Sequence, residues 1–498
     1  MGQQRRRRGA PAVAVLVALV ALAAGCRGQD RDERAELPSR PAARVEADGT
    51  PADDGSTPGD GAAAETIPPP PTTVPLSQPS TDGCSAVVTA PAPLQDAIDA
   101  VTDRTTPYVL CLEGRFEGGG APAAEDRPGV GPYYGGVVIE GRSNFTLRGL
   151  PGSTIAGVVN DGRYPDTEAP ADEQGAADKA NLIKVVDSDH IVLEWLDVDG
   201  RVLPGTGAGP ERDRTLNRLV WFQNVRDSTL RYSRIRHGGG ECVRIKANSQ
   251  RNELHHNEIS DCGFYQFEIQ REERLNKNGE AIYVGTDPAQ IAETQIERQR
   301  YWGLDPKLAT DRSSHNHIHH NLLQPGPPGA DWGNECVDLK EDWPRPQADL
   351  PGDLERGEPG HNVVADNECS GQFDPESGAF DSRGPNNVFE HNLVTGTVEG
   401  AAIRIGAKDK SAGELGEIEW RATDNVVRNN RLESFEYRAA VKAFDDQPLA
   451  LACGNVDAEG RTDFDGRFAS DEDAAVNQPR CAGASAAPGP RGPVGIPT

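Results

Sequence analysis

The chain has 498 residues, of which 36% are hydrophobic and 26% are charged, and its formal net charge at pH 7 is −27. A chain this acidic is not attracted in general to nucleic acid or to anionic membrane surfaces, so a basic surface on it must be local. The length would accommodate three average domains, but short β-units that recur along most of the chain favour one elongated domain, because a solenoid grows by adding coils.

Residues 1–26 have the pattern of a bacterial export signal. A basic segment at 5–8 precedes an apolar run at 12–24 that is short for a membrane span. The run ends in Leu-Ala-Ala-Gly followed by Cys26, which resembles a lipobox with Cys26 as the lipidated first residue of the mature protein. An ordinary secretory signal is the alternative, and the arginines fit either the general or the twin-arginine route. We predict an extracytoplasmic lipoprotein anchored at the bacterial cell membrane.

Residues 27–83 are rich in Pro, Ala, Asp, Glu, Thr and Gly and contain almost no large apolar side chain. A segment of this composition cannot bury enough surface to offset the entropy of ordering it, and its prolines keep it extended. We therefore predict a disordered tether over 27–83. The Pro, Gly and Ala composition of 482–498 predicts a disordered tail after a single folded domain at 84–481.

The folded domain begins with a segment of helical periodicity. Leu94, Ala97, Ile98 and Val101 have the spacing of one helical face, and a strand pattern follows at 108–112. A helix at this place would cover the first coil of a solenoid, which otherwise presents an unpaired strand edge.

A short strand pattern recurs along the chain, and its best copy is the segment 335–340. In that copy Val337 and Leu339 alternate with Asp338 and Lys340, as in a strand with one buried face. Comparable segments occur at 241–246, 280–285, 378–383, 402–406 and 440–444. A unit that repeats with apolar inward positions and varied outward positions is typical of a coil of a solenoid.

A second pattern alternates with the first and contains an asparagine, an apolar residue and, five positions after the first, a second asparagine. Its best copies begin at Asn252, Asn316, Asn362, Asn387 and Asn425, and weaker copies begin at Ser143, Asp189 and Ser228. Asn, Asp and Ser bond to nearby backbone groups in tight turns, so we expect each asparagine column to form a ladder. The shortest distances between copies, 24 and 25 residues, fit one bare coil of a parallel β-helix.

These two repeats resemble the right-handed parallel β-helix of the pectate lyase superfamily over roughly residues 84–444. The resemblance implies an all-β fold, a single-stranded right-handed parallel β-helix with an N-terminal α-helical cap. It does not by itself imply an activity, because this fold serves lyases, hydrolases and non-catalytic surface proteins.

The repeat pattern places several histidines at equivalent positions. The pairs His255-His256 and His319-His320 occupy equivalent repeat positions, where we expect ladder residues rather than metal ligands, and no Cys/His spacing is typical of a zinc site.

Eight cysteines remain when Cys26 is set aside, an even number that indicates disulfides in an exported chain. Free thiols are the alternative for the third pair. The expected neighbours are Cys84 with Cys111, Cys242 with Cys262, Cys336 with Cys369, and Cys453 with Cys481.

Registering the strands gives two outward rows of side chains. The first row reads Lys184, Trp221, Arg244, Tyr283, Asp338, Asp381, Arg404 and Lys442, and the second includes Lys246, Lys340 and Arg383. Because neighbouring coils are about 4.8 Å apart, Asp338 and Asp381 are expected side by side with Lys340 and Arg383 next to them. Surface ion pairs, worth about 0–1 kcal/mol each, are one interpretation of this cluster.

The alternative interpretation is a site for an acidic polysaccharide. A lyase that acts on a uronic acid removes the proton next to the carboxylate, so it needs a base and positive charge or calcium on that carboxylate. Lys340 is our first candidate for the base and Lys246 the second, while Arg383 and Arg404 would neutralise the substrate carboxylate. Asp338, Asp381 and Glu335 are candidate calcium ligands, and Glu241 and Glu280 begin comparable strands as further ligands or as turn residues.

Other side chains of the outward rows and of the loops beside them would contact the sugar. Insertions that leave the same strand end on several coils should build a wall on one side of the solenoid. The predicted substrate-binding residues are Arg244, Tyr283, Trp221, Lys442 and Trp343. A tryptophan that packs a loop onto the solenoid is the alternative reading for Trp343.

The sequence therefore predicts a monomeric polysaccharide lyase that acts by β-elimination, with calcium as its cofactor and no nucleic-acid partner. A glycoside hydrolase that uses Asp338 and Asp381 as its paired carboxylates is the nearest enzymatic alternative. A non-catalytic carbohydrate-binding β-helix at the cell surface is the alternative of a different class.

Overall fold

A computed structural model shows three long parallel sheets that run along one solenoid. The structure describes residues 79–117, 124–127, 131–133, 136–157, 181–201, 218–238, 240–263, 279–286, 311–326, 335–340, 360–371, 378–396, 400–406, 410–411, 417–418, 422–435, 439–443, 449–468 and 477–481. Cys26, Trp343, the predicted tether from 27 to 78 and the predicted tail lie outside these residues, so the lipid anchor remains a prediction. No helix in the described part of the chain is long and apolar enough to span a membrane.

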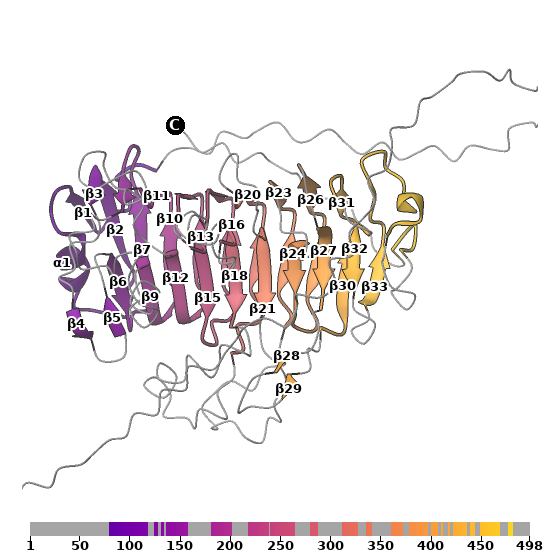
Figure 1. Cartoon of the computed structure of the whole chain (residues 1–498). Helices are drawn as coiled ribbons and strands as arrows, with labels where there is room; N and C mark the ends of the chain where they lie inside the picture. The colour runs from indigo at the N-terminus through magenta and orange to yellow at the C-terminus, as the bar shows by residue number, and fades with distance from the viewer. Residues whose placement is uncertain are drawn as a thin grey trace, which may run out of the picture. The chain divides into compact units, whose positions relative to one another are not determined.

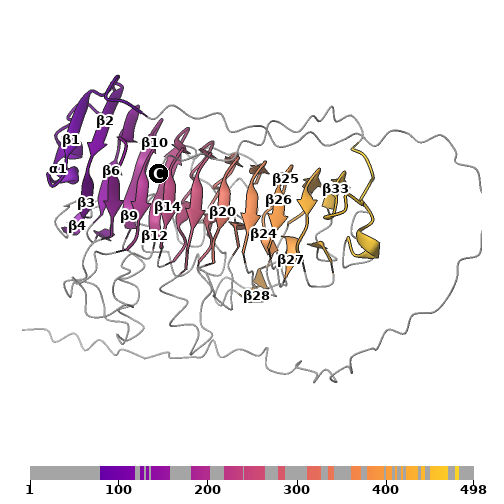
Figure 2. The ribbon, with the colours of Figure 1, turned by 90° about the horizontal axis from the view of Figure 1, so that it is seen from above.

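Figures 1 and 2 show the strands of the three sheets stacked coil after coil from the indigo end to the yellow end. The first sheet contains β1 (Ala86–Thr89), β2 (Tyr108–Glu113), β7 (Phe145–Gly149), β10 (Val192–Glu194), β13 (Thr229–Arg231), β16 (Glu253–His255), β19 (His317–His319), β22 (Val363–Ala365), β25 (Val388–Glu390), β30 (Asn425–Arg428) and β33 (Leu449–Cys453).

The second sheet has nine strands and follows the first along each coil. Its strands are β3 (Arg115–Glu117), β8 (Thr154–Ala156), β11 (Asp197–Asp199), β14 (Arg234–Arg236), β17 (Glu258–Ser260), β20 (Leu322–Gln324), β23 (Glu368–Ser370), β26 (Leu393–Thr395) and β31 (Arg431–Leu432).

The third sheet also has nine strands, and it carries the candidate site. Its strands are β6 (Val137–Glu140), β9 (Asn181–Asp189), β12 (Arg218–Arg226), β15 (Val243–Lys246), β18 (Ile282–Gly285), β21 (Val337–Lys340), β24 (Gly378–Ser382), β27 (Ala401–Ile405) and β32 (Val441–Ala443). Two antiparallel pairs complete the described strands, β4 (Ala124–Arg127) with β5 (Gly131–Tyr133) and β28 (Lys410–Ser411) with β29 (Glu417–Ile418).

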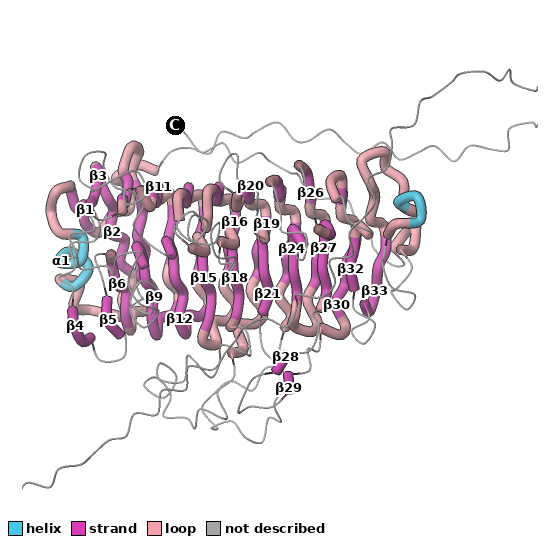
Figure 3. Tube along the Cα trace, in the orientation of Figure 1, coloured by secondary structure: helices cyan, strands magenta, loops and turns pink. Residues whose placement is uncertain are grey.

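The three parallel sheets confirm the predicted all-β right-handed parallel β-helix. Figure 3 shows how little helix the described residues contain: the helix α1 (Leu94–Asp99) at one end and the single 3-10 turn η4 (Phe464–Gly466) at the other. Val337, Leu339, Phe380, Ile403 and Ile405 belong to one continuous buried apolar core, as predicted from their alternation with polar residues.

The helix α1 closes the first coil in the predicted place. The side chain of Gln95 accepts a hydrogen bond from the backbone N–H of Val138 at 2.7 Å and donates one to its carbonyl at 3.1 Å, as a neighbouring strand would. The guanidinium of Arg142 donates to the carbonyls of Ile98 and Val101, at and just after the end of the helix. The cap therefore satisfies the edge of β6 while it covers the apolar end of the core.

Both asparagine columns form buried ladders, as predicted. Each side-chain oxygen accepts from the backbone N–H of the asparagine on the preceding coil, and in the second column the Asn321 amide also donates to Asn367 Oδ1 at 2.9 Å. The second ladder continues beyond the predicted copies through Asn455 to Asn477. The residue before each ladder position adopts a left-handed backbone, for example His256 and His320 at φ 55°. The ladders thus supply the hydrogen bonds that the turning backbone cannot make with itself.

The predicted alignment of two weaker repeat copies was wrong by two residues. Leu193 pairs with Leu147 on one side and with Leu230 on the other, so the copies at Ser143 and Asp189 start two positions before the copy at Ser228. Side chains alternate with a period of two along a strand, so a shift of two leaves the same residues inside. The error arose because a periodic pattern fixes the face of a strand more firmly than its register.

All four predicted disulfides are present: Cys84–Cys111, Cys242–Cys262, Cys336–Cys369 and Cys453–Cys481. The free-thiol alternative for the third pair is therefore wrong. The Cα atoms of the four pairs lie 5.0 to 6.0 Å apart, within the normal range for a disulfide. Four disulfides are the cysteine usage of an extracytoplasmic protein.

Candidate functional site

The first outward row lies on the third sheet in the predicted register. Backbone pairing places each member beside the next, in the order Lys184, Trp221, Arg244, Tyr283, Asp338, Asp381, Arg404 and Lys442. Lys246 pairs with Gln223 and Lys340 with Gly285 in the second row. The backbone N–H of Arg383 bonds to the Leu339 carbonyl, which brings Arg383 next to Lys340.

The two aspartates lie side by side, and each is paired with cations. Asp338 Oδ2 is 2.6 Å from Nζ of Lys340, while Asp381 Oδ2 is 3.3 Å from the Arg404 guanidinium and 3.5 Å from that of Arg383. Both aspartates are 0% exposed, and the side chains of the three cations are 9 to 12% exposed. Solvent screening is weak here, so the interpretation as ordinary surface ion pairs does not fit.

The environment of Lys340 favours its ammonium form in the cation-free chain. Burial and the charge of Arg383 lower the pKa of Lys340, but Asp338, Tyr283 and Glu280 raise it by more, so the net pKa is above the ordinary value. Its Nζ also lies 4.5 Å from the centre of the Tyr283 ring, a contact that stabilises a cation. A role of Lys340 as a base therefore requires that the negative charge around it be compensated.

Three carboxylates converge on one point beside Lys340. One oxygen each from Glu280, Glu335 and Asp338 lies within 4.8 Å of the other two. In the described part of the chain, Oε2 of Glu280 and Oδ1 of Asp338 are buried without a hydrogen-bond partner. Buried carboxylate oxygens of this kind fit a hard divalent cation such as calcium. Asp381, which the sequence also proposed as a ligand, is not in this group and faces the two arginines.

The strand-initial glutamates differ from one another in their partners. Glu241 is ion-paired with Arg218 at 2.6 Å and with Arg244. Burial raises the pKa of Glu241, but the two guanidiniums lower it by more, to about 2. Among the described residues Glu280 forms no ion pair with an arginine, and burial together with the charges of Glu335 and Glu241 raises its pKa well above the usual value. Glu241 is thus paired within the protein, whereas the raised pKa of Glu280 favours its protonated form in the cation-free chain.

Raising the pH should destabilise the cation-free protein through Glu280. A carboxyl group whose pKa is raised by folding keeps its proton in the folded state while the unfolded chain releases it, so stability is lost as the pH rises from about 4.3 toward the raised pKa. Glu280→Gln should flatten this dependence, and calcium should restore stability in the parent but not in the variant. Thermal melting from pH 5 to 9, with calcium or with a chelator, measures both effects. Identical melting profiles for the parent and the Glu280→Gln variant would contradict the assignment of the pH dependence to Glu280.

The aromatic members of the first row, which the sequence proposed as substrate-binding residues, are buried. Trp221 is 5% exposed and Tyr283 is 2% exposed. The Lys246 ammonium lies 4.3 Å from the Trp221 ring centre, and the Arg244 guanidinium lies 3.6 Å from that of Tyr283. These rings are sandwiched by cations, so Trp221, Tyr283 and Arg244 support the row from within.

The accessible parts of the row are positive. Arg383, Arg404 and Lys442 are partly exposed, whereas Asp338 and Asp381 are fully buried beneath their neighbours. A ligand that approaches the outward face at these coils meets guanidinium and ammonium groups on a chain of net charge −27. This local positive surface is the kind that the composition requires for binding an anion.

Comparisons with known proteins identify no family. No family model matches the chain, and no curated protein matches it. Among solved structures it is similar to an alginate lyase from Paenibacillus sp. str. FPU-7, with a TM-score of 0.43 and 13% identity over 78% of this chain and 96% of that one. It is also similar to the pectate lyase Bsp165PelA from Bacillus sp. N165, with a TM-score of 0.35 and 12% identity over 70% and 81%.

A third similar structure is the DFA-IIIase from Arthrobacter chlorophenolicus A6 in complex with DFA-III, with a TM-score of 0.36 and 11% identity over 79% of this chain and 94% of that one. Similarities at this level carry no information about activity, which has to follow from the side chains. The fold and the site together define a right-handed parallel β-helix whose third sheet carries a buried row of acidic and basic groups.

Proposed function

We propose that the third sheet binds an acidic polysaccharide and cleaves it by β-elimination. The observation that carries this proposal is the layered charge of the row, with covered carboxylates below and partly exposed cations above. A polyuronate offers one carboxylate per sugar, which complements the successive cations Arg383, Arg404 and Lys442. These groups supply the positive charge that must stabilise the enolate formed when the proton at C5 is removed.

Lys340 is the proposed base. It lies next to Arg383 on the adjacent coil and two coils from Arg404, so a uronate carboxylate held by these guanidiniums would bring the adjacent carbon toward its amine. Lys246 remains the second candidate, and it lies in the same row two coils away from Lys340. In either case a neutral amine removes the C5 proton, and the electron pair moves to expel the oxygen at C4, which leaves a double bond between C4 and C5.

Calcium is the proposed cofactor, held by Glu280, Glu335 and Asp338. When bound, it would supply positive charge for the substrate carboxylate and compensate the carboxylates around Lys340. With Asp338 and Glu280 compensated, burial and Arg383 dominate the environment of Lys340, and both lower the pKa of its amine. The same residues that hold Lys340 as an ammonium would then allow it to accept a proton.

The hydrolase alternative is weaker in this geometry. Paired carboxylates that act as acid and base have to contact the glycosidic oxygen and a water or the anomeric carbon. Asp338 and Asp381 have no exposed surface and are engaged by Lys340, Arg383 and Arg404. The non-catalytic alternative needs the same cations and differs only in the absence of turnover.

The proposed function is tested by incubating the full-length protein with polymers of galacturonate, glucuronate and mannuronate or guluronate. We expect new ultraviolet absorbance from the C4–C5 double bond with at least one polymer in the presence of calcium, and its loss with a chelator. Reducing ends without this absorbance would indicate a hydrolase. Binding without products would indicate the non-catalytic protein, and the absence of binding to every polymer would contradict the proposal altogether.

A further inference from the structure

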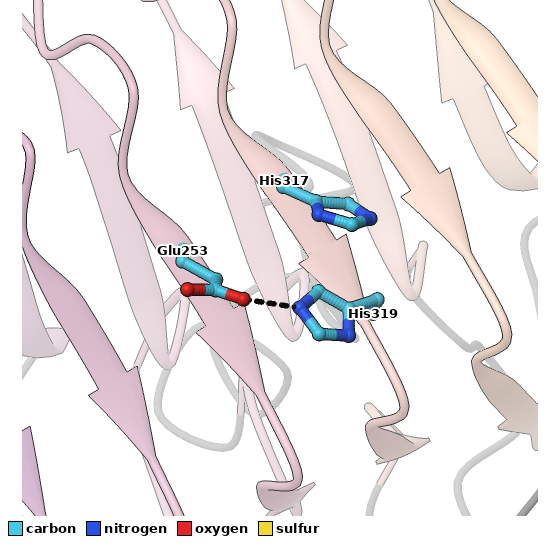
Figure 4. A group of neighbouring side chains, drawn as sticks. All are labelled: Glu253, His317 and His319. Atoms are coloured by element: carbon cyan, nitrogen blue, oxygen red, sulfur yellow. Dashed lines mark hydrogen bonds and ion pairs between the residues drawn. The ribbon is translucent and has the colours of Figure 1, made fainter.

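A cluster of histidines on the first sheet is independent of the proposed site. His317 and His319 are two positions apart on β19, so their side chains leave the same face of the strand. Glu253 on the adjacent strand β16 pairs with His317 in the backbone register. Figure 4 shows the Glu253 carboxylate directed toward His319, with the His317 ring above it on the same strand. Three side chains of metal-ligating chemistry therefore meet on the outer face of two neighbouring coils.

The distances within this cluster suit coordination to one ion. One ligand atom from each of Glu253, His317 and His319 lies within 4.8 Å of the other two. Glu253 Oε1 is already 2.8 Å from Nε2 of His319, and the two histidine rings are stacked with their centres 4.0 Å apart. Glu253 and His317 are exposed, whereas His319 is half-buried. An ion can thus enter from solvent with small rotations of the exposed side chains.

The neighbouring histidines fix the orientation of His319. Its Nδ1 is 2.8 Å from Nδ1 of His320, and its ring stacks on that of His255 at 5.1 Å and 9°. His320 in turn stacks on His256 at 5.0 Å and 7°, which confirms the predicted ladder of His255-His256 on His319-His320. With Nδ1 engaged by His320, Nε2 of His319 is left to face Glu253. A ligating histidine is commonly held in this way through its other ring nitrogen.

His317 is not explained by the ladder. It has no histidine beside it on β16, where the paired residue is Glu253. Among the described residues, no hydrogen bond reaches either ring nitrogen of His317, which contacts the cluster by stacking on His319. An imidazole with both nitrogens available, next to a second imidazole and a carboxylate, has the donor set of a metal site.

The electrostatic environment keeps these rings in the form that binds metals. Burial, the first cause, and the nearby histidines lower the pKa of His319 to about 4, although Glu253 raises it. The pKa of His317 is lowered as well, chiefly by partial desolvation against its neighbours, although the side chain remains exposed to solvent. Neutral imidazoles ligate metal ions, whereas imidazolium ions do not.

We propose that Glu253, His317 and His319 form a binding site for a divalent late transition-metal ion of the zinc class. Imidazole nitrogen and carboxylate oxygen suit zinc, whereas calcium takes oxygen ligands only. Three protein ligands leave at least one coordination position open to water or to an exogenous ligand. The site is chemically distinct from the oxygen-only group of Glu280, Glu335 and Asp338 on the third sheet.

The test is direct titration of the full-length protein, free of any affinity tag, with zinc and separately with cobalt(II). We expect one equivalent of zinc to bind, calcium in excess not to compete for it, and cobalt to give the visible absorption of a site with nitrogen ligands. His317→Ala should weaken zinc binding by on the order of 10–100-fold or more. Loss of a residue that only orients a metal ligand already has an effect of this size, and loss of a ligand should have at least the same effect. Glu253→Gln should weaken it too, since an amide is a poorer ligand.

His190→Ala is the matched control, because His190 forms a similar pair with Asp189 at 2.6 Å. Among the described residues, this pair is not part of a group of three side chains that could hold a metal ion. The His190→Ala variant should leave zinc affinity unchanged. Within the described ranges His317 makes no hydrogen bond that its loss would break, so the His317→Ala variant should melt at the temperature of the parent without metal. Absence of zinc binding by the parent, or unchanged zinc affinity in both His317→Ala and Glu253→Gln, would overturn the proposal. Neither outcome bears on polysaccharide cleavage.

Discussion

Lys340→Ala should abolish polysaccharide cleavage while leaving binding nearly intact. A positioned general base contributes about 10²–10⁴-fold to a rate, and it acts mainly in the transition state, so the loss should fall on kcat rather than on KM. Arg383 and Arg404 remain in the variant to hold the substrate carboxylate. The measurement is the rate of double-bond absorbance at saturating polymer, together with binding of the polymer to the inactive variant.

Lys340→Arg separates the two roles that this side chain can have. A guanidinium keeps the positive charge next to Asp338 but stays protonated, so it cannot act as a base. If Lys340 is the base, the arginine variant should be as inactive as the alanine variant. Activity of Lys340→Arg near that of the parent would show that the charge alone matters and would move the role of base to Lys246. Arg404→Ala is the comparison for binding and should raise KM as well.

The periodic patterns were sufficient to predict the solenoid, because each coil repeats the same physical requirement. An inward apolar residue such as Leu339 and a buried turn amide such as Asn321 are needed on every coil. The columns can therefore be recognised from the regular spacing of these residues along the sequence. The disulfides were predictable from the order of the cysteines, since each bridge, such as that of Cys336 and Cys369, joins two consecutive cysteines. Register was less secure where the signal was weak, as the slip at Ser143 and Asp189 shows.

The site was predictable in its order but not in its depth. Alternation places Asp338 and Tyr283 outward, yet it does not reveal that neighbouring side chains cover them completely. Exposure limits which of these side chains a ligand can reach, because Trp221 and Tyr283 are buried whereas Arg383 and Arg404 are partly exposed. The convergence of Glu280 on Asp338 also needed the three-dimensional arrangement of the adjacent strands β18 and β21.

The histidine cluster carried a signal that the sequence reading did not use. His317 and His319 stand in a His-x-His arrangement on a strand, which places both rings on one face. The pairing of this strand with the strand of Glu253 follows from the aligned repeat copies at Asn252 and Asn316. The prediction that the His-His pairs form a ladder was correct for His255 and His320, but it assigned no role to His317.

Leu339→Asp should prevent folding of the solenoid, although an aspartate is native at the preceding position. Leu339 is fully buried in the apolar core between Val284 and Ser382 of the adjacent coils. Removing a buried leucine side chain costs about 2–5 kcal/mol, and an unpaired buried charge adds several more, against a total stability of about 5–15 kcal/mol for a typical domain. The Ser382 hydroxyl is already engaged with Gly384, so it offers the new carboxylate little compensation.

Asp338 shows why the effect depends on the face of the strand. It is as deeply buried as Leu339, but its carboxylate lies 2.6 Å from Lys340, whereas the strand neighbours of Leu339 are Val284 and Ser382. Leu339→Met is the control, since a swap of similar volume usually costs less than about 1.5 kcal/mol. Circular dichroism and thermal melting of the two purified variants measure the difference. A Leu339→Asp variant that melts with the parent would mean that this face of β21 is not the core, and the assignment of inward and outward residues along the whole third sheet would fall with it.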